Sequence, residues 1–374
     1  MEYIKLGDMV NIKTGKLNAN EGVEGGKYPF FTCSSKTLEI DKYSYDCECV
    51  LVAGNGDLNV KYYNGKFDAY QRTYIIESKD KLKLNNQYMY YFLSKYIEKL
   101  RNNAIGGVIK YIKLNNLTDI IFPLPRLENQ KKIVEVLDKA QSLIDKKREQ
   151  IELLDELVKS RFIEIFGDIR INEKGWEEKE ISNLLISIDS GKSFVCEGYE
   201  RKGEYPAILK LSAVTYGVYN PLENKALIDA NEFIDNMEVK EGDLLFTRKN
   251  TPELVGMCAY VYKTTPNLMM PDLIFRLNTN ENCNKIYLWK LINNEMFREK
   301  IKMISNGSAK SMSNISKQNL MKLKVPVPPI ELQNEFAEFV TKTDSIRSKM
   351  EESLSELEDN FNSLMQRLFK GELF

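Results

Sequence analysis

Two stretches of the chain carry apolar residues at alternating steps of three and four. The first series is Ile133, Leu137, Ala140, Ile144, Lys147, Ile151, Leu154, Val158, Arg161 and Ile165. The second, 203 residues later, is Phe336, Val340, Thr343, Arg347, Met350, Leu354, Leu357, Phe361, Leu364 and Leu368. Such spacing places one stripe on a helix and favours left-handed coiled-coil packing. We expect two helices of roughly 40 residues, about 60 Å long, ending at Gly167 and Gly371.

The remaining pattern is of short apolar runs between turn residues, which predicts strands. These runs lie at 49–53, 72–76, 120–122, 243–247, 273–277 and 324–326. Helices are expected at 86–102 and 285–305. The organisation is therefore two mixed α/β modules, each followed by a long helix, with boundaries at 1–125, 126–166, 167–329 and 330–374.

The chain resembles itself at the same shift of 203 residues. Of the 28 positions from 103 to 130, eight are identical to their counterparts, among them Pro123 with Pro326, Glu128 with Glu331 and Gln130 with Gln333. The long helices resemble each other well, whereas the modules before them align only patchily. This pattern predicts a duplicated frame that carries two diverged heads.

Composition limits the chemistry that the chain can perform. Histidine is absent, which removes the commonest general base and metal ligand. Six scattered cysteines form no C-x-x-C pair, which argues against a zinc finger or a disulfide framework and favours a reduced cytoplasm. No run of apolar residues is long enough to predict a membrane span.

Charge is close to balanced in the first three segments, whereas the last segment is acidic. Residues 1–125 carry 17 basic and 14 acidic groups, 126–166 carry nine of each, 167–329 carry 22 and 21, and 330–370 carry five and nine. The two heads are thus only mildly basic. If the partner is DNA, other chains must supply part of the phosphate contacts.

Several motifs together resemble the specificity subunits of Type I restriction–modification systems, over essentially the whole chain. Residues 121–130 and 325–333 look like the family's IPLPPLxEQ entry into a conserved helix. Gly175-Trp176 with 181–184, and residues 4–10, resemble its domain openings. Residues 160–166 and 363–369 resemble its helix endings.

The resemblance implies an α+β fold. Two α/β target-recognition domains would be separated by two long antiparallel coiled-coil helices, with a pseudo-two-fold internal repeat. Each head would read one half of a split, asymmetric DNA site. The helices would set the spacing and dock two modification subunits. Those partners bind S-adenosylmethionine and methylate adenine N6, a restriction subunit cuts, and this chain needs no cofactor.

Base edges are read mainly by Arg, Lys, Asn and Gln on protruding elements, joined here by small polar loop residues. The candidates in the first head are Ser34, Ser35, Lys36, Asn55, Gln71, Arg72 and, for a phosphate, Lys110. Those in the second head are Lys210, Ser212, Thr215, Arg248, Lys249, Asn250, Ser308, Lys310 and Ser311. Arg248 to Asn250 take the place of Gly54 to Gly56. The alternative for each of these residues is a solvated loop position without DNA contact, and Gln71-Arg72 and Arg248-Lys249 are the favoured candidates.

Catalytic motifs were tested and are incomplete. Residues 190–193 end like a phosphate loop, but Ile186 stands where that loop needs glycine. Residues 327–330 lack the arrangement of amino-methyltransferases. Two other classes stay open: a coiled-coil scaffold that binds only proteins, and an enzyme with an unrecognised carboxylate site. Lys147, Arg161 and Arg347 are either register devices of the helices or contacts for a bound subunit.

Overall fold

The computed structural model describes residues 2–305 and 312–373. The chain divides into two compact units, and each unit takes part of both long helices. Unit 1 comprises residues 1–150 and 350–374, and unit 2 comprises residues 151–349. Helix α4 (Leu127–Phe166) and helix α9 (Ile330–Lys370) have 40 and 41 residues.

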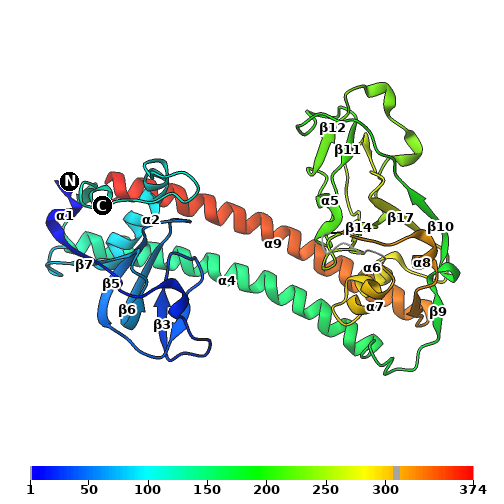
Figure 1. Cartoon of the computed structure of the whole chain (residues 1–374), viewed down its shortest axis with the longest axis horizontal. Coiled ribbons are helices and arrows are strands. Elements are labelled where there is room, and N and C mark those ends of the chain that lie inside the picture. Colours follow the sequence, from blue (N-terminus) through cyan, green and yellow to red (C-terminus); the bar gives the residue numbers. More distant parts are fainter. Residues whose placement is uncertain (1, 306–311, 374) are drawn as a thin grey trace. The chain divides into compact units, whose positions relative to one another are not determined.

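Unit 1 is built on a six-stranded sheet in the order β2-β7-β5-β6-β3-β4 (Figure 1). Its strands are β2 (Val10–Thr14), β3 (Tyr28–Phe31), β4 (Leu38–Ile40), β5 (Tyr45–Ala53), β6 (Val60–Ala69) and β7 (Thr73–Ser78). All pairings are antiparallel except that of β3 with β6. Strands β1 (Glu2–Lys5) and β8 (Ile121–Leu124) form a separate antiparallel pair. Besides its parts of α4 and α9, the unit contains helices α1 (Leu6–Met9), α2 (Asn86–Asn102) and α3 (Leu114–Thr118).

The core of unit 1 lies between its sheet, α2 and the long helices. Helix α2 packs against β5 and β6, and it buries Tyr88, Met89 and Leu93 completely. The same apolar cluster includes residues from the start of α4 and the end of α9, such as Leu137 and Leu368. A second cluster around Phe67 covers the other face of the sheet.

Unit 2 divides its strands among four small sheets. Strands β10 (Leu185–Ser190), β17 (Ile274–Thr279), β13 (Leu244–Thr247) and β15 (Cys258–Tyr260) form one sheet in that order. Strands β12 (Asn224–Ala226), β11 (Ala207–Leu209) and β16 (Leu268–Met269) form another. The two pairs are β14 (Lys249–Asn250) with β18 (Ser313–Asn314), and β9 (Glu178–Glu180) with β19 (Lys324–Pro326). The short helices are α5 (Ser212–Thr215), α6 (Lys285–Asn293), α7 (Arg298–Met303) and α8 (Lys317–Met321).

The single helix expected at 285–305 is wrong, because the structure breaks it between α6 and α7. The backbone of Asn294 is extended (φ −64°, ψ 127°), which ends α6. Its side-chain oxygen then accepts the N–H of Met296 at 2.9 Å, a local turn that competes with helix. Asparagine side chains favour such turns, so the break has a local cause.

The predicted ends of the long helices are confirmed. Helix α4 stops at Phe166 before Gly167 (φ +74°), and α9 stops at Lys370 before Gly371 (φ +77°). A positive φ is easy for glycine and costly for other residues, so the chain leaves the helix there. None of the positions in either three-and-four series is exposed. The apolar stripe of each helix is therefore its buried face.

Within each unit, α4 and α9 are joined by ion pairs in an antiparallel sense. In unit 2, Asp155 of α4 accepts from Arg347, while Glu335 accepts from Arg161, at 2.6 Å in the second pair. In unit 1, Arg148 donates to Glu358 at 2.5 Å. Arg161 and Arg347 thus contact the opposite helix of this chain, which favours the register role over contact with another subunit.

Candidate nucleic-acid interface

In unit 1, backbone hydrogen bonds gather most of the first head's candidates at one end of strands β5 and β7. Gly54, at the end of β5, donates its N–H to Arg72 O at 2.8 Å, and Gly56 donates to Lys110 O at 2.9 Å. Asn55 pairs across this turn with Tyr111. Arg72 and Lys110 are exposed and Asn55 is half-buried. Three candidates from distant parts of the sequence therefore share one edge, which we call the reading edge of unit 1.

The early loop is tied to this same edge. The thiol of Cys33 lies 3.5 Å from Arg72 O, and Ser34, Ser35 and Lys36 follow it, all exposed. Ser34 accepts a hydrogen bond on its carbonyl oxygen from Lys61 Nζ at 2.7 Å. Gln71 is exposed, and its N–H bonds to Leu17 O.

Lys61 was missed by sequence reasoning. Its Nζ lies 5.8 Å from the centre of the Phe31 ring, and burial lowers its pKa from the ordinary lysine value. It is a structural support of the early loop. Only the pairing of β6 with β5 and β3 brings it there, so no local signal in the sequence marks it.

In unit 2, Arg248 takes the place that Gly54 takes in unit 1. Ile112 donates its N–H to Gly54 O, and Ile315 donates to Arg248 O, at 2.9 and 2.8 Å. Lys249 then pairs with Asn314, as Asn55 pairs with Tyr111. The guanidinium of Arg248 lies 5.1 Å from the Phe275 ring centre, and Lys249 is half-buried. This segment, with α5, is the reading edge of unit 2.

The other described candidates of unit 2 lie on α5 and beside it. Lys210 Nζ is 3.5 Å from a carboxylate oxygen of Glu223, and Ser212 donates to the same oxygen at 2.6 Å. Thr215 and Asn250 are buried, and Asn250 Nδ2 donates to Thr215 Oγ1 at 3.1 Å. The side chains of Thr215 and Asn250 hold α5 against the edge and are themselves little exposed.

Three further candidates, Ser308, Lys310 and Ser311, lie outside the described residues. Two residues that sequence reasoning passed over, Tyr111 and Asn314, lie opposite Asn55 and Lys249 on the reading edges. The shift of 203 residues that aligns the two heads also pairs Tyr111 with Asn314, so that alignment was the signal for them.

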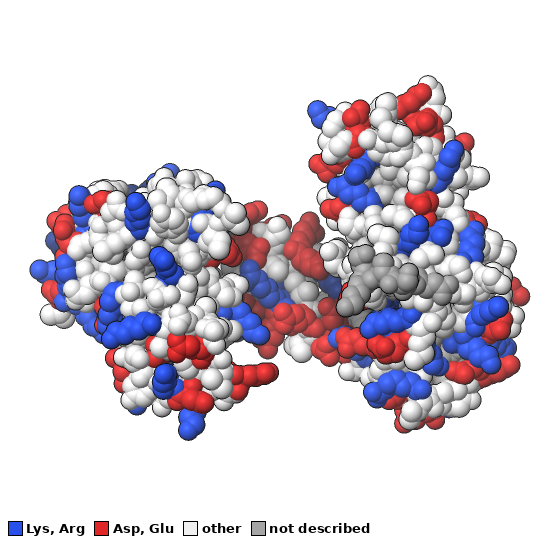
Figure 2. Space-filling model, viewed as in Figure 1, with Lys and Arg blue, Asp and Glu red and all other residues white. Residues whose placement is uncertain are grey.

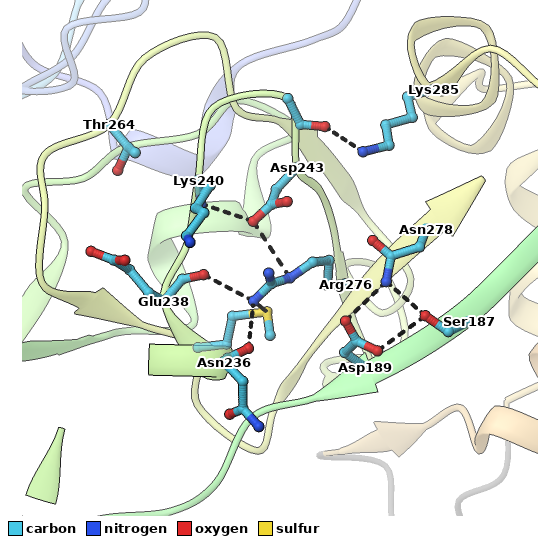
Figure 3. Close-up of polar contacts among 12 residues, drawn as sticks. Ser187, Asp189, Asn236, Glu238, Lys240, Asp243, Thr264, Arg276, Asn278 and Lys285 are labelled. Carbon is cyan, nitrogen blue, oxygen red and sulfur yellow. Dashed lines mark hydrogen bonds and ion pairs between the residues drawn. The ribbon is translucent and has the colours of Figure 1, made fainter. Parts of the chain in front are cut away.

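Behind the reading edge of unit 2, Arg276 of β17 holds a loop in place (Figure 3). Its Nη2 donates to Glu238 O at 3.0 Å and Asn236 O at 3.3 Å, and its Nε lies 3.4 Å from Asp243. Burial raises the pKa of Asp243, opposed by its bond from the Lys240 N–H and by Arg276. Beside this cluster, Asn278 Nδ2 donates to Asp189 at 2.9 Å.

Most of these polar groups bond to one another, and the buried Nε of Arg276 has no hydrogen-bond partner among the described residues. The bonds of Arg276 Nη2 tie the loop at Asn236 and Glu238 to strand β17, which is a structural role. Among the described residues, no group of three or more His, Cys, Asp or Glu side chains is arranged to hold a metal ion. Figure 2 shows basic and acidic side chains interspersed on the visible face of each unit. The arrangement suits binding through a few placed side chains.

A family model identifies the protein family of the chain. The model for the Type I restriction modification DNA specificity domain matches residues 1–153 and 173–359. The chain belongs to this family. The resemblance stated from the motifs is thereby confirmed, and the chain is a Type I specificity subunit.

Curated relatives carry the same description. The chain is 26% identical over 410 residues to the Type I restriction enzyme EcoDI specificity subunit of Escherichia coli, covering 99% of this chain and 88% of the relative. It is 22% identical to the MjaVIII specificity subunit of Methanocaldococcus jannaschii, covering 100% and 92%.

A solved structure matches the fold. The Type I restriction–modification S subunit from M. genitalium superposes with a TM-score of 0.64 at 17% identity, covering 98% of this chain and 96% of that one. A specificity subunit is a non-catalytic component that recognises DNA, so the enzyme alternative is set aside. Within the part that the structure describes, no helix is both long and apolar enough to cross a membrane.

The junction between head and long helix is built alike in both units. In unit 1, Tyr88 donates to Pro123 O, and in unit 2, Tyr287 donates to Pro326 O, each at 2.8 Å. The side chain of Gln130 accepts from Asn85 N at 2.9 Å and donates to Pro125 O at 2.8 Å. Gln333 makes the corresponding bonds in unit 2.

Proposed function

We propose that the two units read the two halves of one bipartite, asymmetric DNA site. The observation that carries this proposal is the matched backbone of the reading edges with different side chains on it. Gly54 and Asn55 in unit 1 stand where Arg248 and Lys249 stand in unit 2, and corresponding segments, at residues 111–112 and 314–315, pair opposite them. Two similar backbone frames that carry different side chains suit the recognition of two different DNA sequences.

The exposed and half-buried candidates are the residues that we propose to contact DNA. In unit 1 these are Asn55, Gln71, Arg72, Lys110 and the loop 34–36. In unit 2 they are Arg248, Lys249, Lys210 and Ser212. Thr215 and Asn250 would act by holding α5. Ser308, Lys310 and Ser311 stay candidates from the sequence alone.

Helices α4 and α9 are proposed to form an antiparallel coiled-coil spacer within an internal duplication. The buried three-and-four stripes support the packing, and the ion pairs of Arg161 and Arg347 support the antiparallel register. The matched glutamine and tyrosine junctions support the duplication. A rigid junction with a stiff spacer would convert helix length into the distance between half-sites.

Catalysis is assigned to partner chains. Two modification subunits would dock along the helices, bind S-adenosylmethionine and methylate adenine N6, and restriction subunits would join them. The balanced charge supports this division, since the heads hold only a small excess of basic groups for a polyanion.

The experiment that tests the spacer lengthens both helices together. One heptad is inserted after Gln150 in α4 and one after Lys349 in α9, so that the ion pairs on each side keep their partners. Seven residues add about 10 Å of helix, which matches about three base pairs. We expect the spacer of the methylated site to grow by about that amount. A control replaces residues of exposed helix positions without changing length, and should keep the original spacer.

The site is read out by sequencing the adenine methylation that the reconstituted enzyme leaves on genomic DNA. Methylation of an unchanged site by the lengthened protein would contradict the spacer role. If the lengthened protein recognised only one of the two half-sites, this would also contradict the spacer role, because the helices would then not hold both heads on the DNA.

A further inference from the structure

The segment from Ile105 to Leu114 in unit 1 displays apolar side chains to solvent. Val108 is fully exposed and Ile109 is 62% exposed, and Ile105, Tyr111 and Leu114 are exposed as well. Surface apolar residues are ordinary when scattered singly, whereas five exposed ones within ten positions need an explanation. We call Val108 and Ile109 the apolar tip.

The apolar tip is held in place by its hairpin. Ile105 and Tyr111 exchange two backbone hydrogen bonds, at 3.0 and 2.8 Å. Gly106 closes the turn with φ +123°, and a Cβ there would lie 2.5 Å from Ile109 O. These bonds and the turn fix the backbone on both sides of the apolar tip.

The same hairpin belongs to the reading edge. Gly56 donates to Lys110 O, and Tyr111 pairs with Asn55, so the tip projects beside Asn55, Arg72 and Lys110. Among the described residues, neither Arg72 nor Lys110 forms an ion pair. Unpaired cationic side chains beside an apolar tip suit a ligand with an anionic surface and an apolar interior. Stacked base pairs inside a phosphate backbone have that chemistry.

We propose that Val108 and Ile109 insert between two base pairs of the first half-site and partly unstack them. Apolar side chains used in this way partly unstack a base step and kink the duplex. Pyrimidine–purine steps unstack most easily, so the tip would favour such a step at its position without contacting a base edge. This inference rests on the proposed DNA reading by unit 1 and adds a mode of recognition to it.

The test uses the complete complex of this chain with its modification subunits. Duplexes carry 2-aminopurine at each adenine of the first half-site in turn, except the methylated one, which methyltransferases extrude by themselves. The wild-type complex should raise the fluorescence of one position, because unstacked 2-aminopurine is brighter. The variant Val108→Ser with Ile109→Ser should abolish that rise and weaken binding about tenfold, the size expected for losing an apolar insertion.

A matched control keeps the same chemistry away from the reading edge. Leu82 is 81% exposed and follows β7, whose other end carries Arg72. Leu82→Ser should leave both the fluorescence and the affinity at the wild-type level. The slope of affinity against salt should stay unchanged in the double variant, because its phosphate contacts are intact.

Three outcomes overturn the inference. Equal fluorescence and affinity in the wild type and the double variant would reject insertion while leaving half-site reading intact. Failure of the double variant to retain the modification subunits would assign the tip to a protein contact. Absence of sequence-selective binding by the wild-type complex would reject the proposed function itself, and the insertion with it.

Discussion

At the scale of single residues, two buried glutamines fix the junction between each head and its long helix. Gln130 and Gln333 are completely buried, and each amide is bonded on both its oxygen and its nitrogen. A buried amide that is fully bonded fixes geometry, because any shift leaves a polar group without a partner. The glutamine of the family's helix-entry motif thus has a physical role, which is to fasten the head to the first turn of the helix.

Replacing Gln333 by leucine should therefore be costly. The N–H of Asn284 and the carbonyls of Asn282 and Pro328 would lose their partners in a dry site. We expect the free energy of unfolding of unit 2 to fall by about 3 kcal/mol. Denaturant unfolding followed by tryptophan fluorescence measures it, since Trp176 and Trp289 both belong to unit 2.

The control for this change is Gln318→Leu, at an exposed position of α8. It should shift the free energy of unfolding by no more than about 0.5 kcal/mol. A loss in Gln333→Leu as small as that of the control would mean that the junction does not depend on the amide.

At the scale of elements, the ion pairs between α4 and α9 set the register more than the stability. The Arg347 side chain is largely covered, whereas Asp155 is about half exposed, so solvent screens the pair. The apolar stripes supply the attraction, and they repeat every turn or two. A cross-helix charge pair distinguishes the correct register from one shifted by a heptad.

Reversing one charge should reveal this pairing. Arg347→Glu should lower the free energy of unfolding of unit 2 by about 1 kcal/mol, through loss of the pair and repulsion from Asp155. Adding Asp155→Arg should restore most of the loss, and high salt should shrink both effects. The same denaturant unfolding measures them.

Lys349→Glu, at an exposed position two residues away on α9, is the matched control and should be nearly neutral. If the double variant were no more stable than Arg347→Glu, the contact between Arg347 and Asp155 would not contribute to the register.

The elements also show where sequence reasoning succeeds. Long helices were predictable because their signals are local and repeated, and the glycines at 167 and 371 mark their ends by backbone geometry alone. The strand at 324–326 and the helix at 86–102 were predicted with the observed bounds. The break at Asn294 was missed because an apolar pattern continues across it, whereas a single asparagine turn interrupts the backbone.

The candidate interface was harder to predict, since its geometry depends on distant pairings. The parallel pairing of β3 with β6 brings Lys61 to the early loop, and no short-range pattern encodes it. Likewise, Thr215 and Asn250 are polar residues in turn-rich segments, and this pattern predicts exposed side chains. In the structure both are buried and bond to each other. Turn residues after the predicted strands, and the comparison of the two heads, marked the edges in the sequence, and packing decides which side chains remain exposed on them.

At the scale of the whole molecule, the charge balance determines how tightly the chain binds DNA without its partners. Both heads carry nearly as many acidic as basic groups, and helix α9 is acidic. Affinity for DNA grows with the number of phosphates neutralised, so the purified chain should bind DNA weakly at physiological salt. Fluorescence anisotropy with a duplex that contains the site measures this.

Adding the modification subunits should tighten binding at the same salt concentration, because on the proposed division they would supply further phosphate contacts. Nanomolar, sequence-selective binding by the chain alone would contradict this division of labour.

The central claim is that this chain chooses which adenines its partners methylate, by reading a site in two halves. Genome-wide sequencing of N6-methyladenine in a host with the gene and in the same host without it tests that claim most directly. We predict one motif of two different specific halves separated by a fixed run of unspecified bases, methylated only when the gene is present. An identical set of methylated sites in the two strains, or a lost motif with a single continuous specific sequence, would contradict the account.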